Sequence, residues 1–188
     1  MKLKFKHQQF QIDAAKAVTD VFQGQQNLGL LEFTHDMGRA VDGSQDMFDV
    51  VGFRNQPINI YSHQLLQNMR TIQMAEQLKP SEEVLMNDLR LTIEMETGTG
   101  KTYVYTRTIF ELNKRYGITK FLIVVPSVAI REGVLKSFQS TRKHFATLYD
   151  NAPMDVFVYD SKDMGPVGNF ATSSSIQVMI INIQAFNA

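Results

Sequence analysis

The sequence predicts an α/β fold in which a mainly parallel sheet is covered by helices. From residue 89 onwards, short apolar runs of strand length alternate with amphipathic segments of helix length, and this alternation is typical of parallel sheets whose strands are joined by helices. A glycine-rich turn also lies between the first of these strands and the helix after it. With 188 residues, 44% of them hydrophobic, the chain is long enough for one globular core.

Two helices are predicted before this alternating region. Residues 8–22 place apolar side chains three or four positions apart and are followed by Gly24, so we expect an amphipathic helix and a boundary near this glycine. A second helix is predicted from Leu65 onwards, ending at Pro80, because proline cannot continue the helical hydrogen-bond ladder. Residues 25–57 mix short apolar stretches with glycines, which indicates irregular structure or short strands.

The elements after residue 88 begin with a strand and a helix. The strand rests on the alternation of Leu89, Leu91, Ile93 and Met95 with polar residues. Residues 101–116 are predicted to form a helix that Gly117 closes. Residues 121–125 are wholly apolar, which predicts a short strand buried on both faces.

The remaining elements complete the predicted sheet. Ser127 is expected to cap a helix that runs to about Phe145. Two further strands are predicted at residues 156–159 and 176–183, separated by a Gly/Ser-rich loop at residues 165–175. Strands and helices in this order imply a parallel sheet with covering helices.

We expect three parts along the chain. Residues 1–24 would form an amino-terminal helix, residues 25–88 an insertion or irregular subdomain, and residues 89–188 the α/β core. The middle part would either pack over the sheet or meet a partner.

Composition and charge exclude few functions. Nineteen Lys and Arg residues balance nineteen Asp and Glu residues, so no global positive field attracts nucleic acid, although a local groove could. The absence of cysteine excludes disulfides, thiolate metal sites and a cysteine nucleophile. No apolar run approaches the roughly 20 residues of a membrane span, so we expect a soluble, cytoplasmic protein.

The segment from Met95 to Thr102 matches the latter part of a phosphate-binding P-loop, with methionine where the generic motif has its first glycine. Gly98 and Gly100 allow consecutive backbone NH groups to curve around an anion, and the next helix directs its positive end to the same place. Lys101 would contact the β and γ phosphates, and the Thr102 hydroxyl would bind Mg²⁺. A glycine-rich turn that binds nothing is the alternative, but the predicted strand-to-helix context is the one that the motif requires.

Four segments carry a family resemblance: Phe10-Gln11, Glu94 to Tyr103, Ile123 to Gly133 and Ile180 to Phe186. They resemble superfamily-two helicases and, more closely, the motor (Res) subunit of type III restriction endonucleases. Thr-Gly-x-Gly-Lys-Thr is shared by many helicases, whereas Val-Pro-Ser-x-Ala-Ile-Arg-Glu-Gly is more particular to the type III subunits. The resemblance implies an incomplete RecA-like P-loop domain that uses ATP and Mg²⁺.

The resemblance also implies a nucleotide site. Gln11 would read the adenine, since its amide can both donate and accept a hydrogen bond on the base edge. The phosphates would be held by Thr97, Gly98, Thr99, Gly100, Lys101 and Thr102, of which Lys101 and Thr102 would also serve catalysis. From the residue alone, Gln11 is more simply a surface glutamine on an amphipathic helix, and only the resemblance favours adenine contact.

A DNA contact is implied where the strand at residues 121–125 ends. By the resemblance, Pro126, Ser127 and Arg131 would meet backbone phosphates, which fixes position on the strand without reading sequence. The alternative is an ordinary strand-to-helix connection with a solvated Arg131-Glu132 pair. We interpret the following basic side chains as a solvated helix face: Lys136, Arg142, Lys143 and His144.

An ATP-hydrolysing motor also needs an acidic residue on a neighbouring strand and an arginine across the cleft. Neither is found before Ala188, so we expect a fragment of the first motor lobe with weak or no activity of its own. The full-length relative would translocate on and cleave double-stranded DNA with a methyltransferase and site-reading subunit. Two alternatives are a lobe of another DNA or RNA helicase and a non-catalytic nucleotide-binding interaction module.

Overall fold

A computed structural model of the chain describes residues 8–29, 31–35 and 50–186, which form two compact units. The first unit comprises the described residues up to Asn27 together with Pro57–Tyr116. The second comprises the described residues of Leu28–Gln56 and of Gly117–Ala188. The three-part division of the chain at residues 24 and 88 stays a prediction. Within the described residues, no helix is both long and apolar enough to cross a membrane.

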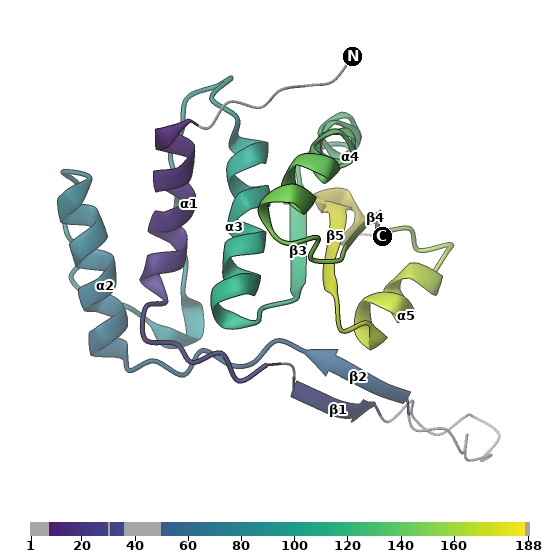
Figure 1. The fold of residues 1–188 in the computed structure, drawn as a ribbon, viewed down its shortest axis with the longest axis horizontal. Coiled ribbons are helices and arrows are strands. Elements are labelled where there is room, and N and C mark those ends of the chain that lie inside the picture. The colour runs from purple at the N-terminus through teal and green to yellow at the C-terminus, as the bar shows by residue number, and fades with distance from the viewer. Residues whose placement is uncertain (1–7, 30, 36–49, 187–188) are drawn as a thin grey trace. The chain divides into compact units, whose positions relative to one another are not determined.

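The first unit is built on helices α1 (Gln9–Val21), α2 (Ser62–Ala75) and α3 (Lys101–Tyr116), with a short 3₁₀ helix η1 (Met86–Asp88). Helices α1 and α3 lie side by side with their amino-terminal ends at the same end, and α1 also packs against α2 (Figure 1). The helices predicted at residues 8–22 and 101–116 are therefore confirmed, including the stop after α3, where Gly117 takes a φ of +69°.

Helix α2 ends before the proline that was expected to stop it. Its last residue is Ala75, and Gln77 takes the left-handed conformation with a φ of +57°. The NH of Leu78 then donates to the carbonyl of Gln73 at 2.7 Å, which satisfies one of the last carbonyls of the helix. A local chain reversal at Gln77, rather than Pro80, ends the helix.

The strand predicted at residues 89–95 is wrong, since no strand forms there. Val21, Ile60 and Leu65 form a buried apolar cluster in this unit, and both Leu89 and Leu91 pack against it. Ile93, the next residue in the alternation, is 41% exposed. The alternation thus reflects packing of one side of the segment on helices, and none of the unit's described residues forms a strand that could pair with it.

The second unit contains a parallel sheet in the order β3-β5-β4, as Figure 1 shows. Its strands are β3 (Lys120–Val125), β4 (Met154–Val158) and β5 (Ile176–Asn182), followed by a 3₁₀ turn η2 (Ile183–Phe186). Helix α4 (Val128–Leu148) joins β3 to β4 and packs against all three strands. The predicted fold class, α/β with a parallel sheet and covering helices, is confirmed.

Burial within this sheet differs from the prediction for its first strand. Leu122 and Val124 of β3, two residues apart and so on one face, are 58% and 51% exposed. Burial of β3 on both faces is therefore wrong. Burial on both faces is found instead in the central strand β5, where Gln177 and Val178 are 2% and 0% exposed. An apolar run reports a tendency to be buried, but not which neighbours cover it.

The Gly/Ser-rich segment predicted as a loop contains helix α5 (Gly165–Thr172), so that prediction is wrong. Pro166 stands in the first turn, where its missing NH has no cost. The Asp163 carboxylate accepts the NH of Gly165 at 3.1 Å, and Phe170 packs edge-on against Phe157 of β4. Capping and packing outweigh the low helix propensity of the two glycines, Gly165 and Gly168.

A two-stranded ribbon belongs to the same unit as the sheet. Strands β1 (Leu31–His35) and β2 (Val50–Arg54) pair antiparallel, in the region expected to be irregular or short-stranded. Asn55 follows directly after β2. Its side-chain oxygen Oδ1 accepts the backbone NH groups of Thr119 and Lys120 at 2.9 Å each, and its Nδ2 donates to the Lys120 carbonyl at 2.8 Å. One side chain thus fastens the end of β2 to the first residues of β3.

Replacing this asparagine should weaken the second unit. In Asn55→Ala, two backbone NH groups and one carbonyl lose their partner, so we expect a loss of about 1–3 kcal/mol in the free energy of unfolding. Urea unfolding followed by circular dichroism measures it. Asn59→Ala is the matched control, because Asn59 is exposed and its hydrogen bond to Gln25 uses the backbone NH. Equal stability of the two variants would contradict this role of Asn55.

Candidate nucleotide-binding site

The candidate phosphate loop is a tight turn directly before α3. Gly98 and Gly100 have φ values of +83° and +88°, a left-handed conformation that strains any residue with a side chain. Helix α3 begins at Lys101, so the NH groups of its first turn lack partners within the helix and are oriented toward the loop. The two predicted glycines therefore stand where the backbone needs them.

The loop is held by hydrogen bonds to one backbone oxygen, the carbonyl of Glu96. It accepts the Lys101 ammonium at 2.8 Å, the Thr99 hydroxyl at 2.7 Å and, at 3.5 Å, the Thr99 NH. This acceptor has no signature in the sequence, because every residue carries a carbonyl. Thr97 is exposed and Thr102 half-buried beside this cluster in the chain. The described residues contain no group of three His, Asp, Glu or Cys side chains that could hold a metal ion.

Gln11 contacts this loop although 88 residues separate it from Thr99. Its Nε2 donates to the Thr99 carbonyl at 2.8 Å, and a Cβ placed on Gly100 would lie only 2.5 Å from the same nitrogen. A glutamine amide has two NH hydrogens and one carbonyl oxygen, so one hydrogen and the oxygen remain for another partner. The structure thus brings together Gln11 and the loop, which the sequence linked only through resemblance.

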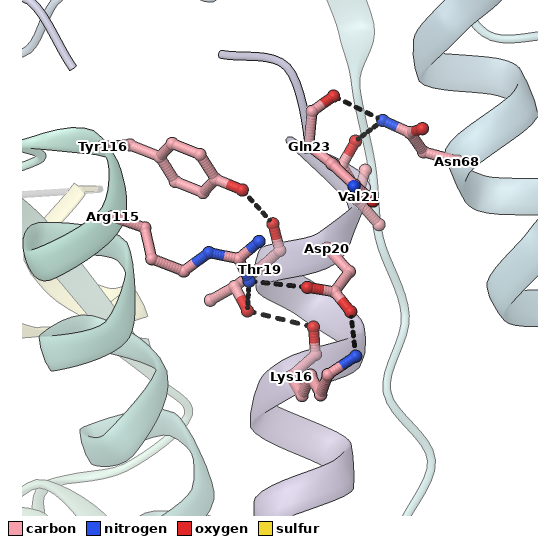
Figure 2. A network of polar contacts seen from close by, with 8 residues as sticks. All are labelled: Lys16, Thr19, Asp20, Val21, Gln23, Asn68, Arg115 and Tyr116. Atoms are coloured by element: carbon pink, nitrogen blue, oxygen red, sulfur yellow. Dashed lines mark hydrogen bonds and ion pairs between the residues drawn. The ribbon is translucent and has the colours of Figure 1, made fainter. Parts of the chain in front are cut away.

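A polar network at the other end of α1 and α3 holds the two helices together, as Figure 2 shows. Arg115 donates through Nη1 to the Asp20 carboxylate at 2.6 Å and to the Thr19 hydroxyl at 2.8 Å. The Tyr116 hydroxyl donates to the Thr19 carbonyl at 2.8 Å, and Lys16 pairs with the second oxygen of Asp20. These residues were not predicted from the sequence, because nothing local pairs positions about one hundred residues apart.

Charge stabilises Asp20 within this network. Burial alone would raise the pKa of its carboxyl, but the hydrogen bonds and positive charges of Lys16 and Arg115 outweigh burial and hold the pKa below its ordinary value of 3.8. Burial also raises the pKa of the Tyr116 hydroxyl, so this group stays protonated as a donor at neutral pH. Helix α2 contributes through Asn68, whose Nδ2 donates to the carbonyls of Val21 and Gln23 (Figure 2).

The candidate DNA-contacting residues lie in the second unit, at the end of β3 and the start of α4. Ser127 caps α4 as predicted, because its hydroxyl accepts the NH of Ile130 at 3.3 Å. Pro126 is exposed. Arg131 is 22% exposed and pairs with Glu132 at 3.1 Å, so its guanidinium is partly covered and already partnered. Any phosphate bound by Arg131 would compete with this carboxylate.

Comparison with known proteins identifies the family of the chain. A family model described as "Type III restriction enzyme, res subunit" matches residues 57–188, more than half of the chain. The chain belongs to this Res-subunit family. The match confirms the resemblance first drawn from four short segments.

Individual relatives agree with the family assignment. The Res-family chain is 37% identical over 132 residues to the type III restriction-modification enzyme EcoPI Res subunit of Escherichia phage P1, covering 67% of this chain and 13% of the relative. It is 38% identical over 115 residues to the StyLTI Res subunit of Salmonella typhimurium strain LT2, a match that covers 52% of this chain and 12% of the relative. It is 33% identical over 109 residues to the EcoP15I Res subunit of Escherichia coli, a match that covers 52% of this chain and 11% of the relative. The chain spans about one eighth of the length of these relatives.

The contact between Gln11 and the loop can be tested with two glycine variants. Gly98→Ala and Gly100→Ala both place a side chain at positive φ, but a Cβ at Gly98 meets nothing within 4 Å. Only Gly100→Ala should therefore displace the Gln11 amide from Thr99. We expect the Gln11 side-chain amide signals in a ¹H–¹⁵N NMR spectrum to shift in Gly100→Ala and to stay in place in Gly98→Ala. Equal shifts in both variants would count against the contact.

The Asp20 network should make the first unit sensitive to acid. Because the folded pKa of Asp20 lies below the unfolded value, its ionised form contributes stability that is complete above the unfolded pKa and is lost as pH falls through the folded pKa. The difference in free energy of unfolding between wild type and Asp20→Asn should therefore shrink from about pH 5 to about pH 2. Urea titrations across this range measure it, and a difference independent of pH would rule out the linkage.

Proposed function

We propose that this Res-family chain binds ATP and Mg²⁺ as the first motor lobe of an ATP-dependent type III restriction endonuclease. One observation carries the proposal: the Gln11 amide, expected to read the base, donates to the Thr99 carbonyl of the loop expected to hold the phosphates. The residue expected to read the base and the loop expected to bind the phosphates thus lie in one compact unit. Membership of the Res family and the positive φ values of both glycines support the same assignment.

The phosphates would be bound by exchange of hydrogen-bond partners. The Lys101 ammonium, now held by the neutral carbonyl of Glu96, would gain a charged acceptor in the β and γ phosphates, and hydrogen bonds to ionised groups are about twice as strong. The NH groups around Gly98 and Gly100 would surround the phosphates, with Thr97 and Thr99 in the same turn. During transfer, Lys101 would stabilise the charge that develops on the γ phosphate.

Magnesium would be bound at the start of α3. The Thr102 hydroxyl supplies one oxygen, and Mg²⁺ takes its remaining ligands from phosphate oxygens and water, which is its usual environment beside a nucleotide. The base would be read by the two groups of Gln11 that Thr99 leaves available. Its carbonyl oxygen accepts the adenine amino group, and its second NH donates to a ring nitrogen.

The second unit would contact DNA through backbone phosphates. Pro126 and Ser127 lie where β3 ends, and Arg131 would exchange Glu132 for a phosphate. Translocation on double-stranded DNA and its cleavage, in complex with a methyltransferase and site-reading subunit in the cytoplasm, would belong to the whole protein. The relatives are named as Res subunits of type III restriction-modification enzymes, which supports a modification partner of this kind.

Calorimetric titration with Mg²⁺ and a non-hydrolysable ATP analogue tests the proposal. Lys101→Ala should weaken binding by at least about tenfold, because the phosphates lose their charged partner. Lys114→Ala is the control, since Lys114 is an exposed lysine in the last turn of the same helix. Circular dichroism verifies that both variants are folded. Unchanged affinity in Lys101→Ala would remove the basis of the assignment, and ATP bound without turnover by the full-length protein would favour a non-catalytic nucleotide-binding module.

A further inference from the structure

We propose that the contacts of Arg115 and Tyr116 with Thr19 and Asp20, here named the far-end clamp, position Gln11 for base selection. The inference rests on the proposed function, and it assigns a specificity role to residues that touch neither the base nor the phosphates. Arg115 and Tyr116 are thus positioning residues, which act through Gln11.

The distance between the clamp and the loop is large. Along α3, Arg115 follows the first residue, Lys101, by fourteen residues, about 21 Å at a helical rise of about 1.5 Å per residue. Along α1, Thr19 follows Gln11 by eight residues, about 12 Å. Helices α1 and α3 run in the same direction, so Gln11 lies near one end of the pair and the clamp near the other (Figure 1). The clamp thus lies about two helical turns or more from Gln11 and acts on it through α1.

The face of α1 between these ends carries small, buried side chains. Gln11, Ala15 and Thr19 are spaced by four residues and so share one face of the helix. Ala15 is 0% and Thr19 1% exposed, which shows that this face is packed. Small side chains allow close approach, but they form shallow ridges that fix the axial position of one helix on another only weakly. We therefore expect directional polar contacts to contribute to the axial position of α1.

The far-end clamp supplies such contacts. Arg115 holds two acceptors with one nitrogen, and the Tyr116 hydroxyl holds the Thr19 carbonyl, which belongs to the α1 backbone itself. Tyr116 is 4% exposed and packs edge-on against Phe22, while Arg115 lies over the Tyr116 ring. A slip of α1 by one residue, about 1.5 Å, would exceed the tolerance of these hydrogen bonds. The clamp therefore fixes the helix that carries Gln11.

Loss of the clamp should affect base selection and leave phosphate binding intact. The phosphate loop continues directly into α3, and its glycines and the Glu96 carbonyl set its shape locally. Gln11 has no such local support, because α1 alone brings it to Thr99. A polar group must stay within about 0.5 Å of its productive position to orient a ligand. The two components of nucleotide affinity thus depend on different parts of the unit.

The test compares the affinities of the chain for an ATP analogue, the matching GTP analogue and inorganic triphosphate, each with Mg²⁺. In Arg115→Met, which keeps the apolar stem and removes the donors, the preference for ATP over GTP should fall by about three- to tenfold. Affinity for inorganic triphosphate should stay within about twofold of wild type, since Lys101 and the loop are unchanged. Lys114→Met, at the neighbouring exposed position, should keep the wild-type preference.

Two further variants separate positioning from general destabilisation. Tyr116→Phe removes a single hydroxyl and should lower the preference even if Arg115→Met folds poorly. In a Gln11→Ala background, Arg115→Met should cause no further loss, because a residue that acts through Gln11 has no effect without it. In the nucleotide-free protein, the Gln11 side-chain amide signals should shift in Arg115→Met.

Each outcome bears on a different claim. A wild-type ATP preference retained in both Arg115→Met and Tyr116→Phe, with unshifted Gln11 signals, would overturn the clamp and leave the proposed function standing. Parallel loss of triphosphate affinity would assign these residues a merely structural role. A folded wild-type chain that shows no preference for ATP would overturn the proposed reading of adenine, and the role of the clamp in base selection with it.

Discussion

The docking of α1 along α3 is the constraint on which the candidate site depends. The phosphate loop needs only its own glycines and the first turn of α3, but Gln11 reaches it from 88 residues away. Closing so long a loop has an entropic cost that local structure cannot offset. Buried Ala15 and Thr19, with the ion pair of Arg115 and Asp20, provide the compensating contacts. Without them, the glycine turn and the glutamine would be two unrelated surface features.

The second unit depends in a similar way on contacts between distant segments. Its central strand β5 pairs with both neighbours and carries most of the buried residues of the sheet. The first residues of β3 are satisfied from outside the sheet by Asn55, which precedes them by more than sixty residues. The ribbon of β1 and β2 is therefore part of the sheet-bearing unit, although its sequence shows no periodicity that would assign it there.

The sequence predicts elements whose signals are local, and it misses features that depend on partners. Helical periodicity located α1 and α3, and the Ser127 cap was correct because it needs only its own residue and the next turn. At residues 89–95, the alternation arises because Leu89 and Leu91 pack against the apolar cluster of the first unit. Alternation alone does not show whether the segment packs on helices or pairs with another strand. Within the candidate site, the loop was recognisable from its motif, whereas the Glu96 carbonyl and the far-end clamp have no sequence signature.

Of the two binding steps expected of the site, phosphate binding depends on local contacts and base selection on contacts between distant segments. The Lys101 ammonium has an acceptor in the Glu96 carbonyl, so a neutral ligand would gain little by displacing it, whereas a triphosphate offers full negative charge. If the proposed function holds, selection for polyphosphate would follow from charge within eight residues of chain. Selection for the base would require the fold, because an amide without net charge discriminates only when its orientation is fixed. On the proposed function, a chain that kept the loop but loosened α1 would still bind polyphosphate and would lose its preference for one base.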